Sequence, residues 1–257
     1  MKERIITAIC LLAIGLPLVF LGGWWFIILG LLATIFAIYE LLKMHDQTKE
    51  VLVGAKLLTF FTTMFLVFIP SLNEALFVGF LGFILVLILN HAAKNFKSTK
   101  FHLFIIPYIG LSFRALLEIR SQGLALFIFL IATVILTDSG AYFVGKFFGK
   151  RKLAPVISPN KTVEGALGGW FVGFTFAIIF GISAHLFNNL FVLLTLAIML
   201  PILSQCGDLL ASYLKRKYGI KDYGNLFPGH GGIMDRVDSQ LLAAIILYIA
   251  MQLGGIS

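Results

Sequence analysis

Apolar runs about as long as a lipid bilayer is thick recur along almost the whole chain, and no other feature constrains its fold as strongly. A transmembrane helix needs roughly 20 consecutive apolar residues, and this chain offers such a run repeatedly between short polar connections. Of its 257 residues, 60% are hydrophobic and only 12% are charged, which lies outside the usual composition of soluble domains. The sequence therefore predicts an all-α polytopic membrane protein.

The runs predict about nine transmembrane helices. Their expected ranges are 5–21, 24–42, 52–69, 75–89, 101–119, 124–148, 166–184, 190–214 and 239–253. The first run is followed by Gly-Gly-Trp-Trp and not by a small-residue cleavage site, so it is interpreted as a span and not as a removed signal peptide.

The positive charges indicate the orientation of these helices. With the N-terminus in the cytoplasm, almost all Lys and Arg residues fall in cytoplasmic loops, and only Arg114 and Arg120 lie toward the outside. Arg114 is interpreted as forming a local ion pair with Glu118, four residues on. An odd number of spans then places the C-terminus outside. Because this bias accounts for the formal net charge of +8, no nucleic-acid partner is expected.

Two cytoplasmic segments, 146–165 and 212–238, are too long and too polar to be simple connectors. Function is expected in them, because binding and catalytic residues concentrate in loops that a rigid framework positions. The predicted spans of residues 1–90 contain no charge away from their edges. Residues 1–90 are therefore expected to be a transmembrane scaffold, and residues 91–257 the catalytic region.

Acidic residues within or beside the predicted spans are candidates for chemistry, because an ionised side chain in lipid costs at least about 2.5 kcal/mol. Asp138 and Asp208 lie inside predicted spans, toward their cytoplasmic ends. Asp235 and Asp238 precede the last span on one helix face, at the same depth. Four carboxylates, without cysteine and with one nearby histidine, favour a hard cation such as Mg²⁺ over zinc.

A simpler interpretation of the same acids stays open. A lysine or a proton could neutralise Asp138 and Asp208. Asp235 and Asp238 could serve only as caps at a helix N-terminus, where negative charge is favourable.

Basic residues and a glycine-rich turn accompany the acids. The basic residues that bracket the acids from the two cytoplasmic segments are Lys161, Lys215, Arg216, Lys217, Lys221, His230 and Arg236. The Pro-Gly-His-Gly-Gly turn at 228–232 is expected to leave backbone N–H groups free for an anion just before a helix N-terminus. This combination predicts phosphate groups bound together with a metal. The alternative for the cations is anchoring to anionic lipid.

A glycine face is expected on the span at 166–184. Gly165, Gly169 and Gly173 are spaced four residues apart, which is typical of close helix packing. The same face is compatible with a homodimer.

The last loop also carries a motif. From Ser212 to Asp238 the chain matches S-x-L-K-R-x4-K-D-x-G-x2-F-P-x-H-G-G-I-x-D-R-V-D. This pattern resembles the signature of the phosphatidate cytidylyltransferases, also called CDP-diacylglycerol synthases. The segments S-P-x-K-T-x-E-G at 158–165 and D-x-x-A-Y at 138–142 are also similar to that family. Together these matches cover about the C-terminal half of the chain.

The resemblance implies a nucleotidyltransferase that converts CTP and phosphatidic acid into CDP-diacylglycerol and pyrophosphate. It implies a multi-pass protein of the cell's inner (cytoplasmic) membrane, working at the cytoplasmic face with phosphatidic acid of the inner leaflet. The implied cofactor is Mg²⁺, with a second cation such as K⁺ left open. CTP, phosphatidic acid and membrane lipids are then the partners.

Roles for the candidate residues follow from this resemblance. The expected catalytic residues are Lys161, Asp208, Asp235 and Arg236. The expected metal ligands are Asp138, Glu164, Asp208, Asp235 and Asp238. The expected substrate-binding residues are Ser158, Lys161, Lys215, Arg216, Lys221, His230, Gly231, Gly232 and Arg236. The segment 158–165 is expected to be an active-site turn in which Pro159 sets the path and Glu164 orients Lys161 or the metal.

Two other functions remain alternatives. A CTP-dependent transferase could act on another lipid phosphate or on a polyprenol through the same chemistry. A cation-coupled transporter is also conceivable because intramembrane acids mark ion pathways. Such transporters usually contain paired half-repeats, which this sequence does not show.

Overall fold

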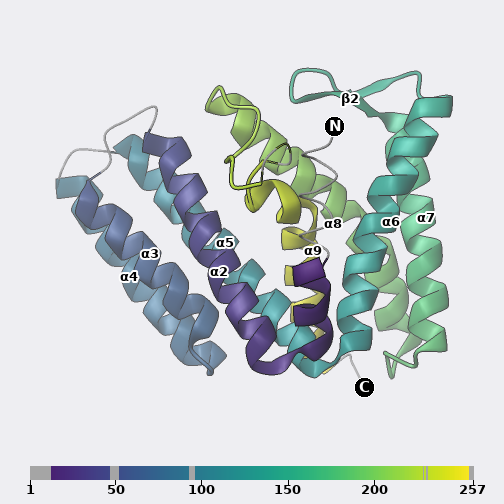
Figure 1. The fold of residues 1–257 in the computed structure, drawn as a ribbon, viewed down its shortest axis with the longest axis horizontal. Helices are drawn as coiled ribbons and strands as arrows, with labels where there is room; N and C mark the ends of the chain where they lie inside the picture. Colours follow the sequence, from purple (N-terminus) through teal and green to yellow (C-terminus); the bar gives the residue numbers. More distant parts are fainter. Residues whose placement is uncertain (1–12, 47–51, 93–95, 228, 230, 255–257) are drawn as a thin grey trace. The chain divides into compact units, whose positions relative to one another are not determined.

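The computed structural model describes residues 13–46, 52–92, 96–227, 229 and 231–254 (Figure 1). In this part of the chain six helices are long and apolar enough to cross a membrane. They are α2 (Gly23–Asp46), α4 (Leu72–Ala92), α5 (Phe96–Gln122), α6 (Leu124–Phe148), α7 (Val163–Ser183) and α8 (Leu190–Lys217). The predicted all-α, multi-pass membrane fold is therefore confirmed.

Three further helical segments match predicted spans but are either too short or too polar to count among these six helices. Residues 13–21 are helical, and the earlier residues of that predicted span lie outside the described part. Helix α3 (Val53–Phe68) has 16 residues, so it measures about 24 Å against a hydrocarbon core of roughly 30 Å. Helix α9 (Met234–Gln252) carries charged residues in its first turns.

Large apolar side chains are exposed along the helices. Trp24 on α2, Phe77 on α4 and Phe171 on α7 are more than half exposed. Contiguous exposed apolar surface of this kind is rare on soluble monomers and fits helices whose outer faces contact lipid.

The chain forms two compact units. Unit 1 comprises Met1–Leu117 and Ile220–Arg236, and unit 2 comprises Glu118–Gly219 and Val237–Ser257. Most of the last loop, Ile220–Arg236, packs with the N-terminal helices in unit 1. The expected division into a scaffold of residues 1–90 and a catalytic region of residues 91–257 stays a prediction.

Unit 1 contains α2, α3, α4 and most of α5, which lie side by side (Figure 1). Arg114 of α5 is 2% exposed and binds the C-terminal end of α3. Its guanidinium donates to the carbonyl oxygens of Ile69 at 2.6 Å and Pro70 at 2.8 Å. The last carbonyls of a helix have no partner within the helix, and a cation there is favourable. Arg114 therefore caps α3, a role that its spacing from Glu118 did not indicate.

Unit 2 contains α6, α7 and α8, and the expected glycine face of α7 lies against α6. A Cβ on Gly169 would approach the carbonyl oxygen of Thr137 to 2.5 Å, and one on Gly165 would approach that of Ala141 to 2.7 Å. The glycines therefore permit close packing within the chain. Because α6 covers this face, it gives no support to a homodimer.

A β-hairpin precedes α7, where a turn was expected. Strand β1 (Lys152–Ala154) pairs antiparallel with β2 (Ser158–Thr162). Pro159 fits in β2 because both strands of a two-stranded sheet are edge strands. The Thr162 hydroxyl accepts a hydrogen bond from the Gly165 amide at 3.1 Å and so begins α7. The prediction of a proline-directed turn at 158–165 was therefore wrong, since this segment is a strand followed by a capped helix.

Candidate functional site

Unit 2 brings together side chains from four elements. Lys161 of β2 and Asp208 of α8 form an ion pair with 2.6 Å between Nζ and Oδ2. Asp138 of α6 lies close enough to both to interact with them electrostatically. The Ser212 hydroxyl donates to the other oxygen of Asp208 at 3.3 Å. The structure thus brings the side chains of Asp138, Lys161 and Asp208 together, and their catalytic and ligand-binding roles stay predictions.

The first turns of α9 complete this group. Asp238 faces Lys215 of α8 across 3.9 Å, and its Oδ1 accepts the Ser239 amide at 2.9 Å. The Ser239 side chain hydrogen-bonds Asp138. Helices α8 and α9 approach closely here, because a Cβ on Gly207 would lie 2.5 Å from the carbonyl oxygen of Asp238. We call the group formed by the following five residues the aspartate–lysine cluster: Asp138, Lys161, Lys215, Asp208 and Asp238.

The cluster is half-buried and still accessible. The side chains of Lys161 and Asp208 are 26% and 30% exposed, whereas those of Lys215 and Asp238 are 12% and 14% exposed. A partly exposed ion pair gains little net stability, since solvent screens it. The ion pair of Lys161 with Asp208 therefore binds these side chains only weakly to each other.

The ligand atoms of the cluster are of the chemical type that a hard cation prefers. Carboxylate oxygens, without thiolate or imidazole, are the ligands that Mg²⁺ prefers. Within the part of the chain that the structure describes, however, no three His, Cys, Asp or Glu side chains are grouped so that they could hold a metal ion. The lysine ammonium groups lie beside the carboxylates instead.

Asp235 has different surroundings, in unit 1. Its Oδ2 accepts backbone N–H groups of Tyr223 at 2.8 Å and Gly232 at 2.9 Å. Gly231 has a φ of +81°, and a Cβ there would lie 2.6 Å from the same oxygen. The Phe227 amide donates to the Gly231 carbonyl at 2.9 Å and closes the loop. The loop before α9 is thus folded around the Asp235 carboxylate.

Glu40 of α2 is a residue that the sequence analysis missed. It is only 4% exposed, and its carboxylate accepts the amides of Ile233 and Met234, both at 3.0 Å. It lies two positions inside the predicted span 24–42 and was treated as an edge residue. The signal that identified Asp138 and Asp208, an acid within an apolar run, applies equally to Glu40.

These contacts change the expected role of the glycine-rich turn. The consecutive amides of Gly232, Ile233 and Met234 donate to the carboxylates of Asp235 and Glu40. Of the turn at 228–232, the Gly232 amide is thus bound by Asp235 and is not free for a phosphate. Anion binding by the rest of that turn stays a prediction. Pro228 and His230 lie outside the described residues.

Glu164 is engaged by the backbone of the segment that leads into the hairpin. Its Oε2 accepts the amides of Lys150 at 3.0 Å and Arg151 at 3.1 Å, and its Oε1 lies 3.5 Å from the Arg151 guanidinium. These contacts anchor β1 to the start of α7, whereas orientation of Lys161 by Glu164 stays a prediction.

The other expected residues lie around these two regions. Arg216 at the end of α8, Lys221 in the last loop and Arg236 in the first turn of α9 are exposed, and Ser158 is half-buried in β2. Asp208 and Asp235 belong to different compact units. Their joint binding of one metal therefore stays a prediction.

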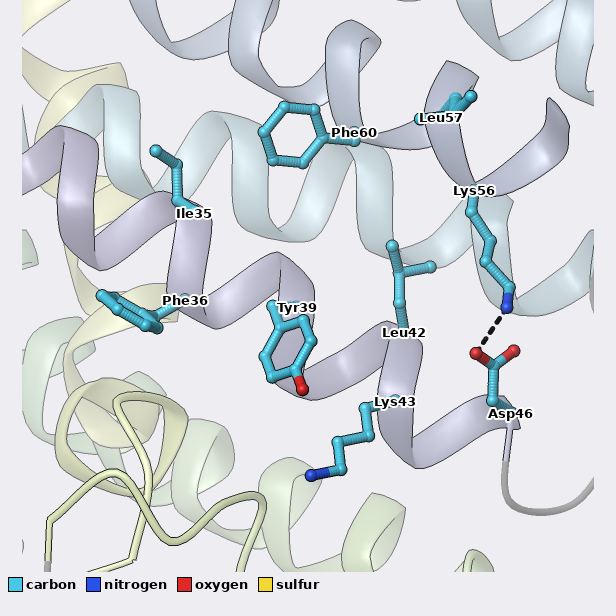
Figure 2. Close-up of a pocket in the computed structure, with 9 residues that line it drawn as sticks. All are labelled: Ile35, Phe36, Tyr39, Leu42, Lys43, Asp46, Lys56, Leu57 and Phe60. Atoms are coloured by element: carbon cyan, nitrogen blue, oxygen red, sulfur yellow. Dashed lines mark hydrogen bonds and ion pairs between the residues drawn. The ribbon is translucent and has the colours of Figure 1, made fainter. Parts of the chain in front are cut away.

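An apolar cavity of about 630 Å³ lies elsewhere in unit 1, between α2 and α3 (Figure 2). Its walls include Ile35, Phe36 and Phe60, and the ion pair between Lys56 and Asp46 lies at its polar end. None of the residues that line it belongs to the predicted site. The candidate regions are therefore the aspartate–lysine cluster, within unit 2, and the loop before α9, within unit 1.

Comparisons with known proteins cover nearly the whole chain. The model of the cytidylyltransferase family matches residues 2–254. The phosphatidate cytidylyltransferase of Bacillus subtilis (strain 168) is 38% identical, over 98% of this chain and 98% of its own length. Proteins of the same name from Staphylococcus epidermidis and Staphylococcus aureus are 36% and 34% identical, over 98% of this chain and 99% of theirs. The similarity thus includes the N-terminal half, which the motifs of the sequence did not cover.

Proposed function

The chain belongs to the cytidylyltransferase family, and we propose that it transfers the cytidylyl group of CTP to phosphatidic acid, giving CDP-diacylglycerol and pyrophosphate. The observation that carries this proposal is the aspartate–lysine cluster at the ends of membrane-spanning helices. A water-soluble triphosphate and a lipid phosphate can meet only where polar groups reach into the membrane region. The cluster offers exchangeable cations for both phosphates at such a position.

The reaction is a displacement at the α-phosphorus of CTP. A phosphate oxygen of phosphatidic acid attacks in line and forms the new P–O bond. The bond from the α-phosphorus to the bridging oxygen breaks, and pyrophosphate leaves with that electron pair. Because phosphatidic acid is an anion near neutral pH, no strong general base is required. Catalysis then consists mainly of positioning the reactants and of stabilising the charge that develops on the phosphate oxygens.

Lys161 and Lys215 bind these phosphates in our proposal. Without substrate, each lysine has a carboxylate beside it, Asp208 or Asp238, which keeps it in place. An incoming phosphate offers more negative charge than one carboxylate, so the lysine turns to it. Exposed Arg216, Lys221 and Arg236, together with Ser158, are assigned to capture of the triphosphate from the cytoplasm.

Mg²⁺ is part of this proposal, and one or two of the carboxylates of Asp138, Asp208 and Asp238 would hold it together with substrate phosphates and water. When bound, the ion would neutralise charge on the phosphates. Asp235 and Glu164, which were also expected as ligands, have carboxylates that already accept backbone amides. A second cation such as K⁺ is not needed for the steps above.

We further propose that the protein lies in the inner membrane with nine spans, adding the predicted span 5–21, α3 and α9 to the six long apolar helices. The N-terminus is cytoplasmic and the C-terminus is outside. The concentration of Lys and Arg on one set of loops supports this orientation. A homodimer is not part of the proposal, because α6 covers the glycine face of α7.

The direct test is release of pyrophosphate by purified protein that depends on both CTP and phosphatidic acid. Asp208→Asn should lower kcat/KM by about 100-fold, because loss of a charged partner at the reacting phosphates is worth up to about 3 kcal/mol. Asp46→Asn, which breaks an ion pair outside the site, is the matched control and should keep wild-type activity. Wild-type protein that releases no pyrophosphate with these substrates refutes the proposed function. Full activity in Asp208→Asn removes that residue from the site.

A further inference from the structure

We propose that Glu40 is a positioning residue for the reaction, which links the N-terminal helix α2 to the catalytic loop. Its carboxylate holds the loop before α9 and the first turn of α9, which carries Asp235 and Arg236 and is followed by Asp238 in the next turn. The contact itself is a property of unit 1, and its connection to catalysis rests on the proposed function. The N-terminal region is then more than the scaffold that the sequence suggested.

The first step is the bonding of the carboxylate. Its two oxygens accept from two consecutive amides, Oε1 from Ile233 and Oε2 from Met234, each at 3.0 Å. Met234 is the first residue of α9, so these amides belong to the helix start, where N–H groups have no partner within the helix. A negative charge at this end also interacts favourably with the helix dipole. Glu40 therefore caps α9 from 193 positions away in the sequence.

The second step is burial. Glu40 is 4% exposed, in a helix that is otherwise strongly apolar. A buried carboxylate is costly unless hydrogen bonds replace its lost contacts with water. The two amides supply such bonds, so the helix start and Glu40 depend on each other. Removal of either partner leaves a buried polar group without its hydrogen bond.

The third step is the space around the carboxylate. A Cβ on Gly224 would lie 2.6 Å from Glu40 Oε1, and a Cβ on Gly232 would overlap the Glu40 carboxyl group. Both glycines belong to the motif of the last loop. Their lack of a side chain lets the loop backbone wrap around the Glu40 carboxylate. These two motif glycines are thus explained by a residue of α2, and not by a phosphate.

The consequence for the reaction is geometric. Gly232, Ile233 and Met234 are held in sequence by Asp235 and Glu40, so the direction in which α9 begins is set by these two carboxylates. Without Glu40 the first turn of α9 frays. Arg236 and Asp238, which follow in that turn and the next, then lose their fixed positions, and small displacements of positioning groups can lower rates strongly.

The experiment combines hydrogen exchange with kinetics on the full-length protein. In Glu40→Ala, peptides that contain the amides of Ile233 and Met234 should exchange about tenfold faster or more, whereas peptides around Gly165 in unit 2 should be unchanged. The kcat for pyrophosphate release should fall by about 10- to 100-fold, with a smaller change in KM for CTP. Glu40→Gln keeps the shape and one acceptor oxygen, so it should recover part of both effects. Glu74→Ala removes an exposed acid at the start of α4 and is the matched control.

The outcomes are distinguishable. Unchanged exchange at Ile233 and Met234 in both Glu40 variants overturns the capping contact. Faster exchange with wild-type kcat overturns the positioning role while leaving the contact intact. Faster exchange in the variants, combined with no pyrophosphate release by wild-type protein, leaves the contact standing and refutes the proposed function alone.

Discussion

The acids around the last loop in unit 1 and the acids of the aspartate–lysine cluster in unit 2 are held in opposite ways. In unit 1, Glu40 and Asp235 accept hydrogen bonds from backbone amides of the last loop. In unit 2, Asp208 and Asp238 face the ammonium groups of lysines. A backbone amide cannot leave its partner unless the loop unfolds, whereas a lysine side chain can rotate away. Glu40 and Asp235 therefore hold the loop in place, whereas the cluster carboxylates of Asp208 and Asp238 are paired with side chains that can move.

The free-energy cost of losing each kind of contact differs in the same way. A partly exposed ion pair such as Lys161 with Asp208 contributes about 0–1 kcal/mol, so a substrate can replace it at small cost. Leaving a buried group without its hydrogen-bond partner costs about 1–3 kcal/mol, which applies to Glu40 and the amides it binds. Mutations in unit 2 should therefore change activity more than stability. Mutations around Glu40 should change both.

The largest loss of activity is expected for Lys161→Met, in the aspartate–lysine cluster of unit 2. The variant removes the ammonium from the cluster and should lower kcat/KM by about 100-fold, since charge-assisted contacts to phosphate are among the strongest in a site. Its melting temperature should stay close to that of the wild type. Lys56→Met, which breaks the ion pair with Asp46, is the control and should keep full activity. Normal turnover in Lys161→Met would place the phosphate site elsewhere.

A smaller loss of activity, accompanied by a loss of stability, is expected for Gly232→Ala. The added methyl group overlaps the Glu40 carboxyl group and forces the loop apart, which costs about 1–3 kcal/mol. Thermal unfolding should shift downward and pyrophosphate release should fall by about tenfold. A Cβ on Gly54 would have its nearest neighbour, a side-chain atom of Leu89, 3.9 Å away, so Gly54→Ala should behave like the wild type. If Gly232→Ala is as stable as Gly54→Ala, the Glu40 carboxylate does not pack against the loop at Gly232 as described.

The smallest effect is expected for Glu164→Gln, which tests an acid of unit 2 that binds amides instead of a lysine. Loss of its charge weakens the hold on Lys150 and Arg151, so trypsin should cut after these residues several-fold faster. Activity should fall only about two- to fivefold, and the Mg²⁺ concentration for half-maximal activity should not change. A large rise in that concentration would instead assign Glu164 to the metal.

The helices were predictable in detail because apolar run length is visible along the chain. The expected span 124–148 coincides with α6 (Leu124–Phe148), and the run at 190–214 lies within α8 (Leu190–Lys217). The hairpin was not predictable in the same way. Strand β2 (Ser158–Thr162) is short, polar and contains Pro159, so nothing in its local pattern distinguishes it from a turn.

The site was predictable only in part. The cost of placing a charge in lipid was enough to identify Asp208, and the loop residue Lys161 was recognised as a cation near it. The same rule was not applied to Glu40, which lay too near the end of a predicted run. Asp235 was identified as functional, but the pattern did not show that its partners are the amides of Tyr223 and Gly232.

The sequence by itself determined that the chain crosses the membrane repeatedly, that the motifs of its last loop resemble one enzyme family, and that certain acids need partners. These properties follow from composition, spacing and the cost of burying charge, which local stretches of sequence reveal. Only the tertiary structure decided which partner each acid obtains. Glu40 meets amides 193 positions away, whereas Asp208 meets a lysine from a hairpin. Such pairings depend on how helices pack, because the partners are neighbours in space and not along the chain.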